Sequence, residues 1–188
     1  VQTCALPILG FIEETGAAQY YRDAKILTIY EGTTAIQAND LVGRKTARDG
    51  GQTAKAIASQ IEQTEKQLKA HSDARCHAVA KRLSAAREAF LDVVEFFVAE
   101  SKSNPNAVYA GSVPYLMLAG NLMSGWQMGR AMLVALEHIA KNDDVAFMQA
   151  KVTTARFYAD HILCKAPGLR DSIIAGADSV TEMALEAF

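Results

Sequence analysis

Long runs of apolar residues at helical spacing constrain the fold of this chain more than any other feature. In two successive runs, apolar residues recur every three or four positions: Ile57, Ile61 and Leu68, then Val79, Leu83, Ala86, Phe90, Val93 and Phe97. This spacing places the apolar side chains on one face of an α-helix. No run alternates with the period of two that is typical of a half-buried strand. The sequence therefore predicts an all-α fold with amphipathic helices packed as an up-and-down bundle.

The strongest break in the helical pattern is Asp49-Gly50-Gly51. Each glycine costs roughly 1 kcal/mol inside a helix and favours a turn. The break separates a first segment, residues 10–48, from a predicted bundle domain, residues 52–188. Within the first segment we predict a helix over residues 13–27, a tight turn over residues 28–33, and a second helix, capped by Thr33 or Thr34, that ends near Lys45.

The later helices of the bundle are predicted from their start and stop signals. Ser103-Asn104-Pro105-Asn106 interrupts the pattern, and Pro114 suits the first turn of a helix that ends near Lys141. Asp143 or Asp144 would cap the next helix, which Pro167-Gly168 would stop. A last helix is predicted from Asp178 to Phe188.

The segment Val113–Ala140 is apolar enough to raise the question of a membrane span. Three polar residues interrupt it: Asn121, Gln127 and Arg130. Its many small residues suit a buried and closely packed helix, and Gly125 and Gly129 would let another helix approach. We therefore predict a buried helix and no membrane span.

Charge and cysteine content limit the possible partners. The 19 basic and 21 acidic residues give a formal charge of -2, and residues 52–188 contain 14 Lys and Arg against 15 Asp and Glu. A chain with nearly equal positive and negative charge is poorly suited to bind nucleic acid, because such binding depends on basic residues that displace counterions from the phosphates. The three cysteines and four histidines show no metal-ligand spacing, which predicts no metal site. Unpaired cysteines fit a cytoplasmic protein.

The first residues do not resemble a secretory signal, and the chain begins without Met. One in-frame reading of Val1–Ile8 is a common sequencing-adapter string. Our expectation is that residues 1–9 are a non-native segment joined to a gene fragment. A short natural loop is the alternative.

Taken by itself, Glu31 is the strongest candidate for chemistry in the chain. It lies between an aromatic residue and a glycine at a predicted helix junction. Burial there would raise the pKa of its carboxyl group, as a general base working near neutral pH requires. The alternative is an ordinary exposed loop glutamate, which is the commoner case.

Three stretches resemble the carboxyl-terminal part of the acyl-CoA dehydrogenase family: Gly10-Phe11-Ile12-Glu13-Glu14, Tyr21-Arg22-Asp23-Ala24-Lys25-Ile26 and Ile29-Tyr30-Glu31-Gly32-Thr33-Thr34-Ala35-Ile36-Gln37. Residues 52–188 are similar to the extra helical domain of the larger members. The resemblance implies an oxidoreductase that oxidises acyl-CoA thioesters with FAD and passes electrons to an electron-transfer flavoprotein. It also implies a homo-oligomer, and a need for upstream domains that hold most of the flavin, so this chain alone is expected to be inactive.

The resemblance also assigns roles to residues. Glu31 matches the catalytic base, Gly32 lets the thioester pass close to the main chain, and Tyr30 lines the acyl slot. Positions that touch FAD in the family match Thr33, Thr34, Ala35 and Gln37. Plain helix capping and packing is the alternative for these four, and Arg22 with Asp23 fits a structural charged pair. Two other functions stay open. The chain could belong to a DNA-binding relative of the family, or its bundle could serve only to buttress or oligomerise the full-length protein.

Overall fold

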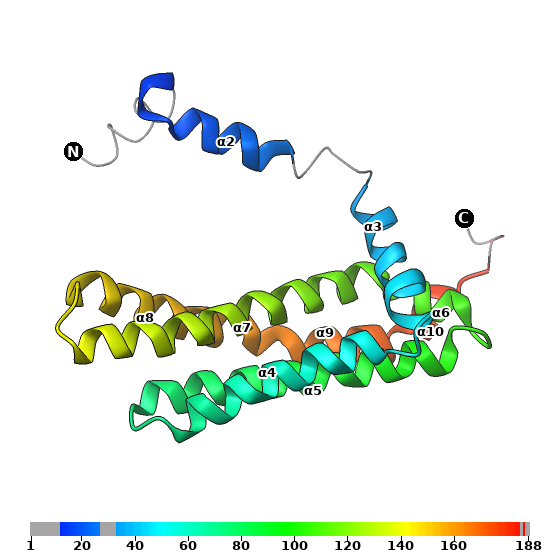
Figure 1. Ribbon diagram of the computed structural model, residues 1–188. Coiled ribbons are helices and arrows are strands. Elements are labelled where there is room, and N and C mark those ends of the chain that lie inside the picture. Colours follow the sequence, from blue (N-terminus) through cyan, green and yellow to red (C-terminus); the bar gives the residue numbers. More distant parts are fainter. Residues whose placement is uncertain (1–11, 27–32, 185, 187–188) are drawn as a thin grey trace. The chain divides into compact units, whose positions relative to one another are not determined.

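The computed structural model describes residues 12–26, 33–184 and 186 of the 188-residue chain, without the side chain of Thr181. All the regular elements of these residues are helical, which confirms the all-α prediction (Figure 1). Their contacts form two compact units, Val1–Gln37 and Ala38–Phe188.

The first unit is described from Ile12. It contains the 3₁₀ turn η1 (Glu13–Thr15), helix α2 (Ala17–Ile26) and the beginning of helix α3 (Thr34–Asp40). Gly16 separates η1 from α2 with a φ of 76°, so the helix predicted over residues 13–27 is broken near its start. Leu27 and nearly all of the predicted inter-helix turn lie outside the described residues.

The second unit is a bundle built mainly on four long helices. These are α4 (Gln52–Ala70), α5 (Ala74–Glu100), α7 (Ser112–Ala140) and α8 (Val145–His161). Shorter elements complete it: the π-helix η2 (Leu41–Ala47), α6 (Pro105–Ala110), the 3₁₀ turn η3 (Leu163–Lys165), α9 (Ala166–Ile174) and α10 (Ala177–Thr181). Helix α5 packs against α4, α7, α8 and α9, so it lies at the centre of the bundle.

The core of the bundle is formed by the apolar stripes that the sequence predicts. Fully buried members include Ile61, Leu68, Leu83 and Phe97. Phe97 meets the ring of Tyr115 edge-on, with 4.9 Å between centroids. The predicted periodicity of α4 and α5 is therefore the burial pattern of these helices.

Gly125 and Gly129 allow the close approaches that their spacing predicts. A Cβ at Gly125 would lie 2.6 Å from Cδ2 of Leu163 in η3. A Cβ at Gly129 would lie 3.1 Å from Cδ1 of Leu68 in α4. Helix α7 thus packs closely against two other elements. Among the described residues, no helix is long and apolar enough to cross a membrane.

The turn at Asp49-Gly50-Gly51 is present as predicted. Gly50 and Gly51 have φ values of 66° and 75°, and a Cβ at Gly51 would lie 2.6 Å from Val94 Cγ1. The Asp49 carboxylate accepts hydrogen bonds from the Gly51 and Thr53 amides at 2.9 and 3.0 Å. Glycine is required here by both backbone conformation and space.

The segment before this turn packs on the bundle. Ala38, Val42 and Thr46 are each at most 2% exposed, and the Thr46 and Tyr115 hydroxyls are hydrogen bonded at 3.0 Å. The predicted segment boundary at residues 49–51 and the observed contact boundary after Gln37 therefore fall at different places. Residues 38–48 precede the glycine turn in sequence but share the core of the bundle.

The breaks predicted at Pro105 and Pro167 differ from the structure. Pro167 was expected to stop a helix, but α8 ends at His161 and Pro167 lies in the first turn of α9. A proline costs nothing there because the first turn needs no backbone donor. Helix α6 was not predicted, because Asn104-Pro105 was interpreted as a break. The same two residues begin α6: Asn104 Oδ1 accepts a hydrogen bond from the Ala107 amide at 3.3 Å, and Pro105 is the first residue of the helix.

The other helix ends follow prediction in part. Pro114 lies in the first turn of α7, and Lys141 caps its carboxyl end. Asp144 precedes α8 but makes no side-chain cap hydrogen bond. Helix α10 ends at Thr181, well short of the predicted end at Phe188.

Candidate functional site

The candidate site lies around the start of α3. Glu31, Tyr30 and Gly32 lie outside the described residues, so their predicted roles stay predictions. Thr33 is the first described residue after them. Its hydroxyl oxygen accepts a hydrogen bond from the Ile36 amide at 3.3 Å, and its carbonyl accepts one from the Gln37 amide at 3.1 Å. Of the two predicted caps, Thr33 is the one that caps α3.

The other predicted cofactor-contacting residues follow in the first turns of α3. Thr34, Ala35 and Gln37 are all exposed, as is Thr33. The first amides of a helix have no intrahelical acceptor, and the helix dipole adds partial positive charge at this end. Exposed hydroxyls beside such amides are the kind of donor set that binds anions at helix N-termini.

Helix α2 carries the predicted charged pair in a different form. Gln19 joins the two residues: Arg22 donates to its Oε1 at 2.9 Å, and its Nε2 donates to Asp23 Oδ1 at 2.8 Å. Arg22 also lies 3.6 Å from the Glu13 carboxylate, with both side chains more than half exposed. The described residues of this helix include none that is buried.

A buried ion pair in the bundle escaped the sequence analysis. The Glu65 side chain is 1% exposed, and its carboxylate accepts two hydrogen bonds from Arg87, at 2.8 and 3.2 Å. These hydrogen bonds are the main cause of the raised pKa of Arg87. The signal was present in the sequence, because Glu65 lies between Ile61 and Leu68 on the apolar face of α4. Its carboxylate is fully paired, so we interpret it as structural.

Other buried polar groups are also satisfied. Trp126 donates to the Thr64 hydroxyl at 2.8 Å. Burial raises the pKa of Tyr115 to about 12 and that of the Cys76 thiol above its usual value, which leaves both groups protonated at neutral pH. Cys76 is buried and Cys164 is half-buried. Within residues 12–26, 33–184 and 186, no cluster of His, Cys, Asp and Glu could hold a metal ion.

Two family models match the chain. The model described as "Acetyl-CoA dehydrogenase C-terminal like" matches residues 54–184, and the acyl-CoA dehydrogenase C-terminal domain matches residues 8–45. The chain belongs to the acyl-CoA dehydrogenase family, as its resemblance indicates. The two matches are separated near the predicted glycine turn, although residues 38–45 pack with the bundle.

Curated relatives agree with this assignment. The chain is 49% identical over 94% of its length to 3-methylmercaptopropionyl-CoA dehydrogenase of Ruegeria pomeroyi. It is 33% identical over 95% of its length to a broad-specificity linear acyl-CoA dehydrogenase of Mycobacterium tuberculosis, and 30% identical over 95% to a butyryl-CoA dehydrogenase of Syntrophomonas wolfei. In each case it spans 30% of the relative's length.

Proposed function

We propose that this chain is part of an FAD-dependent acyl-CoA dehydrogenase in which Glu31 is the catalytic base. The observation that carries the proposal is the match of residues 8–45 to the acyl-CoA dehydrogenase C-terminal domain, because this stretch contains Tyr30-Glu31-Gly32 and the start of α3. The 49% identity to an enzyme named for an acyl-CoA substrate supports the same activity.

In the proposed reaction the Glu31 carboxylate removes a proton from the carbon next to the thioester carbonyl. A flavin held in part by the start of α3 would supply the acceptor for the hydride of the neighbouring carbon, so that a double bond forms between the two carbons. The backbone amide of Glu31 donates a hydrogen bond to the thioester oxygen, which makes the α-proton more acidic. Gly32 admits the thioester close to the main chain, and Tyr30 lines the acyl slot.

The start of α3 would contribute to cofactor binding. Thr34 offers an exposed hydroxyl beside the first amides of the helix, and Ala35 leaves those amides accessible. Gln37 is exposed two residues further on. An electron-transfer flavoprotein as electron acceptor and a homo-oligomeric parent enzyme belong to the same proposal.

The test is Glu31→Gln in the full-length enzyme. Flavin absorbance should be retained, and turnover with an artificial electron acceptor should fall at least about a hundredfold, because general base catalysis contributes roughly 10² to 10⁴ in rate. The substrate panel should include 3-methylmercaptopropionyl-CoA and butyryl-CoA, the thioesters that the relatives' names specify.

Glu14→Gln is the matched control, since Glu14 is an exposed carboxylate of the same segment. It should leave turnover unchanged. If Glu31→Gln keeps more than about a tenth of the turnover, the base is another residue.

A second test concerns the start of α3. Thr34→Val removes a hydroxyl without disturbing the Thr33 cap, and should weaken flavin retention about tenfold through the loss of one hydrogen bond to a charged group. Asn39→Ala, an exposed change further along the same helix, is the control. Equal flavin content in both variants would remove Thr34 from the site.

A further inference from the structure

A cavity of about 160 Å³ lies between the π-helix η2 and the bundle helices α4, α5 and α7. Most of its lining is apolar and includes Leu41, Ile57, Phe90 and Met123. Protein cores are close-packed and contain few voids larger than a water molecule. The bundle therefore encloses an apolar space that its own side chains do not fill.

The polar groups of the cavity wall already have hydrogen-bond partners. The hydroxyls of Thr46 and Tyr115 are bonded to each other at 3.0 Å, and both residues are at most 2% exposed. A buried water molecule needs about two to four polar partners. The inner part of the cavity is therefore better suited to an apolar group than to ordered water.

The mouth of the cavity carries positive charge. Of the described residues that line it, Lys45 alone is charged, and its side chain is exposed. Lys45 forms no ion pair with a carboxylate of residues 12–26, 33–184 and 186. The carboxylate of Asp49, four residues further on, accepts hydrogen bonds from the Gly51 and Thr53 amides. The mouth therefore favours a negatively charged group.

The backbone that covers the cavity is unusual. Leu41, Lys45 and Thr46 come from η2, in which the Arg48 amide donates to the Gly43 carbonyl, five residues earlier, at 3.2 Å. Such π-turns are rare and are found frequently at functional sites. This backbone is a second observation, independent of the cavity volume, that points to a ligand here.

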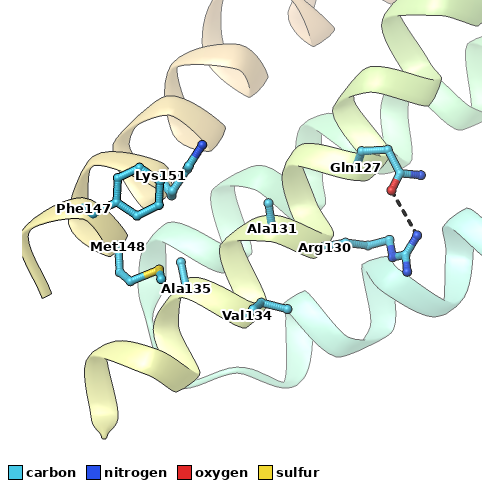
Figure 2. A pocket seen from close by; sticks show the side chains of 8 residues that line it. All are labelled: Gln127, Arg130, Ala131, Val134, Ala135, Phe147, Met148 and Lys151. Carbon is cyan, nitrogen blue, oxygen red and sulfur yellow. Dashed lines mark hydrogen bonds between the residues drawn. The ribbon is translucent and has the colours of Figure 1, made fainter. Parts of the chain in front are cut away.

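Two other hollows of the bundle suit a small anion less well. The groove between α7 and α8 is larger, about 420 Å³, but its Val134 and Phe147 side chains are 52% and 50% exposed, so it is an open surface (Figure 2). The groove between α4 and α5 contains Glu62 and Glu95, which would repel an anion.

We propose that the cavity under η2 binds an aliphatic carboxylate of about six carbons. A cavity of about 150 Å³ holds benzene, so this one has room for a chain of five or six carbons. The tail of the ligand lies among Leu41, Phe90 and Met123, and its carboxylate pairs with the Lys45 ammonium at the mouth. The ligand is a free acid, which distinguishes it from the CoA thioester proposed to react at Glu31.

The first test titrates the 188-residue chain with sodium hexanoate and, as a salt control, with sodium chloride. The methyl resonances of the methionines report where the ligand binds. Met123 lines the cavity and should shift with a dissociation constant of about 1 mM, a reasonable value for so small a ligand. Met148 lines the α7–α8 groove and should not shift.

The second test varies the tail. From butyrate to hexanoate, each added methylene should raise the affinity about fourfold, because it moves from water into an apolar space. Octanoate and decanoate should gain no more, because the cavity is then full. An affinity that keeps rising to decanoate would mean that the acids bind an open surface instead.

The third test concerns the carboxylate. Lys45→Gln should weaken hexanoate binding about fivefold, as expected for one exposed ion pair, and should leave the binding of 1-hexanol unchanged. Lys69→Gln, at an exposed lysine of α4 outside the cavity, is the matched control and should change neither. If the unaltered chain binds 1-hexanol as tightly as hexanoate, the site does not recognise a carboxylate.

The fourth test fills the cavity. Ala119 is a half-buried residue of α7 in the cavity wall, so the ring of Ala119→Phe should occupy the space and abolish hexanoate binding. Ala119→Leu, a smaller change, should weaken binding and serves if the first variant does not fold. Ala140→Phe, at an exposed alanine of the same helix, is the control and should bind normally.

Two further results would overturn the proposal. Met123 could fail to shift at about 20 mM hexanoate, far above the expected dissociation constant, or Met148 could shift in its place. Ala119→Phe, folded by its thermal melt, could bind hexanoate as well as Ala140→Phe does. None of these results bears on the role of Glu31, because no test uses flavin or a CoA thioester.

Discussion

The two units of this chain use their apolar residues differently. In the described part of the first unit, Tyr20, Tyr21 and Ile26 are 79%, 69% and 47% exposed. In the bundle, residues of similar type such as Phe97 and Tyr115 are at most 1% exposed. Both units carry helical periodicity, so periodicity alone does not make a core. A core forms only where the apolar faces of different helices pack against one another. In the bundle, the long helices that pack on α5 provide such faces.

The largest expected difference between the units is the cost of removing a large aromatic side chain. Phe97→Ala should lower the free energy of unfolding of the chain by about 3–5 kcal/mol, because it leaves a cavity beside Tyr115. Tyr21→Ala should change it by less than about 0.5 kcal/mol, as usual for exposed positions. Urea denaturation followed by circular dichroism measures both. Equal losses would show that α2 contributes to the cooperative fold.

A second experiment sharpens the boundary between the units. A chain that starts at Ala38 retains Val42 in the core and the hydrogen bond between the Thr46 and Tyr115 hydroxyls. A chain that starts at Gln52 loses both, and should be less stable by about 2–4 kcal/mol. Both should still melt cooperatively as helical bundles, whereas a peptide of residues 10–37 should be mostly coil.

Thermal melts of the two bundle fragments test this directly. Val42→Ala in the longer fragment is the control, with an expected loss of about 1–2 kcal/mol. If the two fragments melt at the same temperature, residues 38–51 add nothing to the bundle. If the shorter one melts without cooperativity, residues 52–188 do not fold independently of residues 38–51.

The smallest expected effect concerns charge. The Asp73 carboxylate caps α5 and pairs with Arg75, and the hydrogen bonds from Arg75 lower its pKa from 3.8 to about 2. A carboxyl whose pKa is lower in the folded protein stabilises it above the unfolded pKa and loses this effect as pH falls. The pair is partly exposed, so Asp73→Asn should cost about 0.5–1 kcal/mol at neutral pH.

The difference between wild type and Asp73→Asn should close between pH 3.8 and about 2. Glu13→Gln in the first unit is the control, because the exposed Glu13 side chain lies 3.6 Å from Arg22 and should contribute nothing measurable. Unfolding free energies measured at several pH values provide the comparison. A constant difference down to pH 2 would contradict an ionic role for Asp73.

The sequence by itself determined the fold class and most of the long helices of this protein. It did so because burial on one helix face imposes a period that is read directly from residues such as Ile61, Leu83 and Phe97. The turn at residues 49–51 was also predictable, since only glycine adopts its backbone angles without strain. The family was recognisable from the residues around Glu31.

Only the tertiary structure decided which elements share a core and how buried polar groups are paired. The glycines of Asp49-Gly50-Gly51 predict a boundary between two segments, yet Val42, which precedes them, belongs to the core of the bundle. The burial of Val42 depends on residues distant in sequence, which a local pattern does not contain. Pro167 lacks a backbone N–H whether it follows the end of a helix or lies in the first turn of one, so the residue alone does not say which. The structure places it in the first turn of α9, after the end of α8, where Leu163 packs over Gly125. Glu65 is tolerated in the core because Arg87 lies opposite it, and no local pattern encodes that pairing.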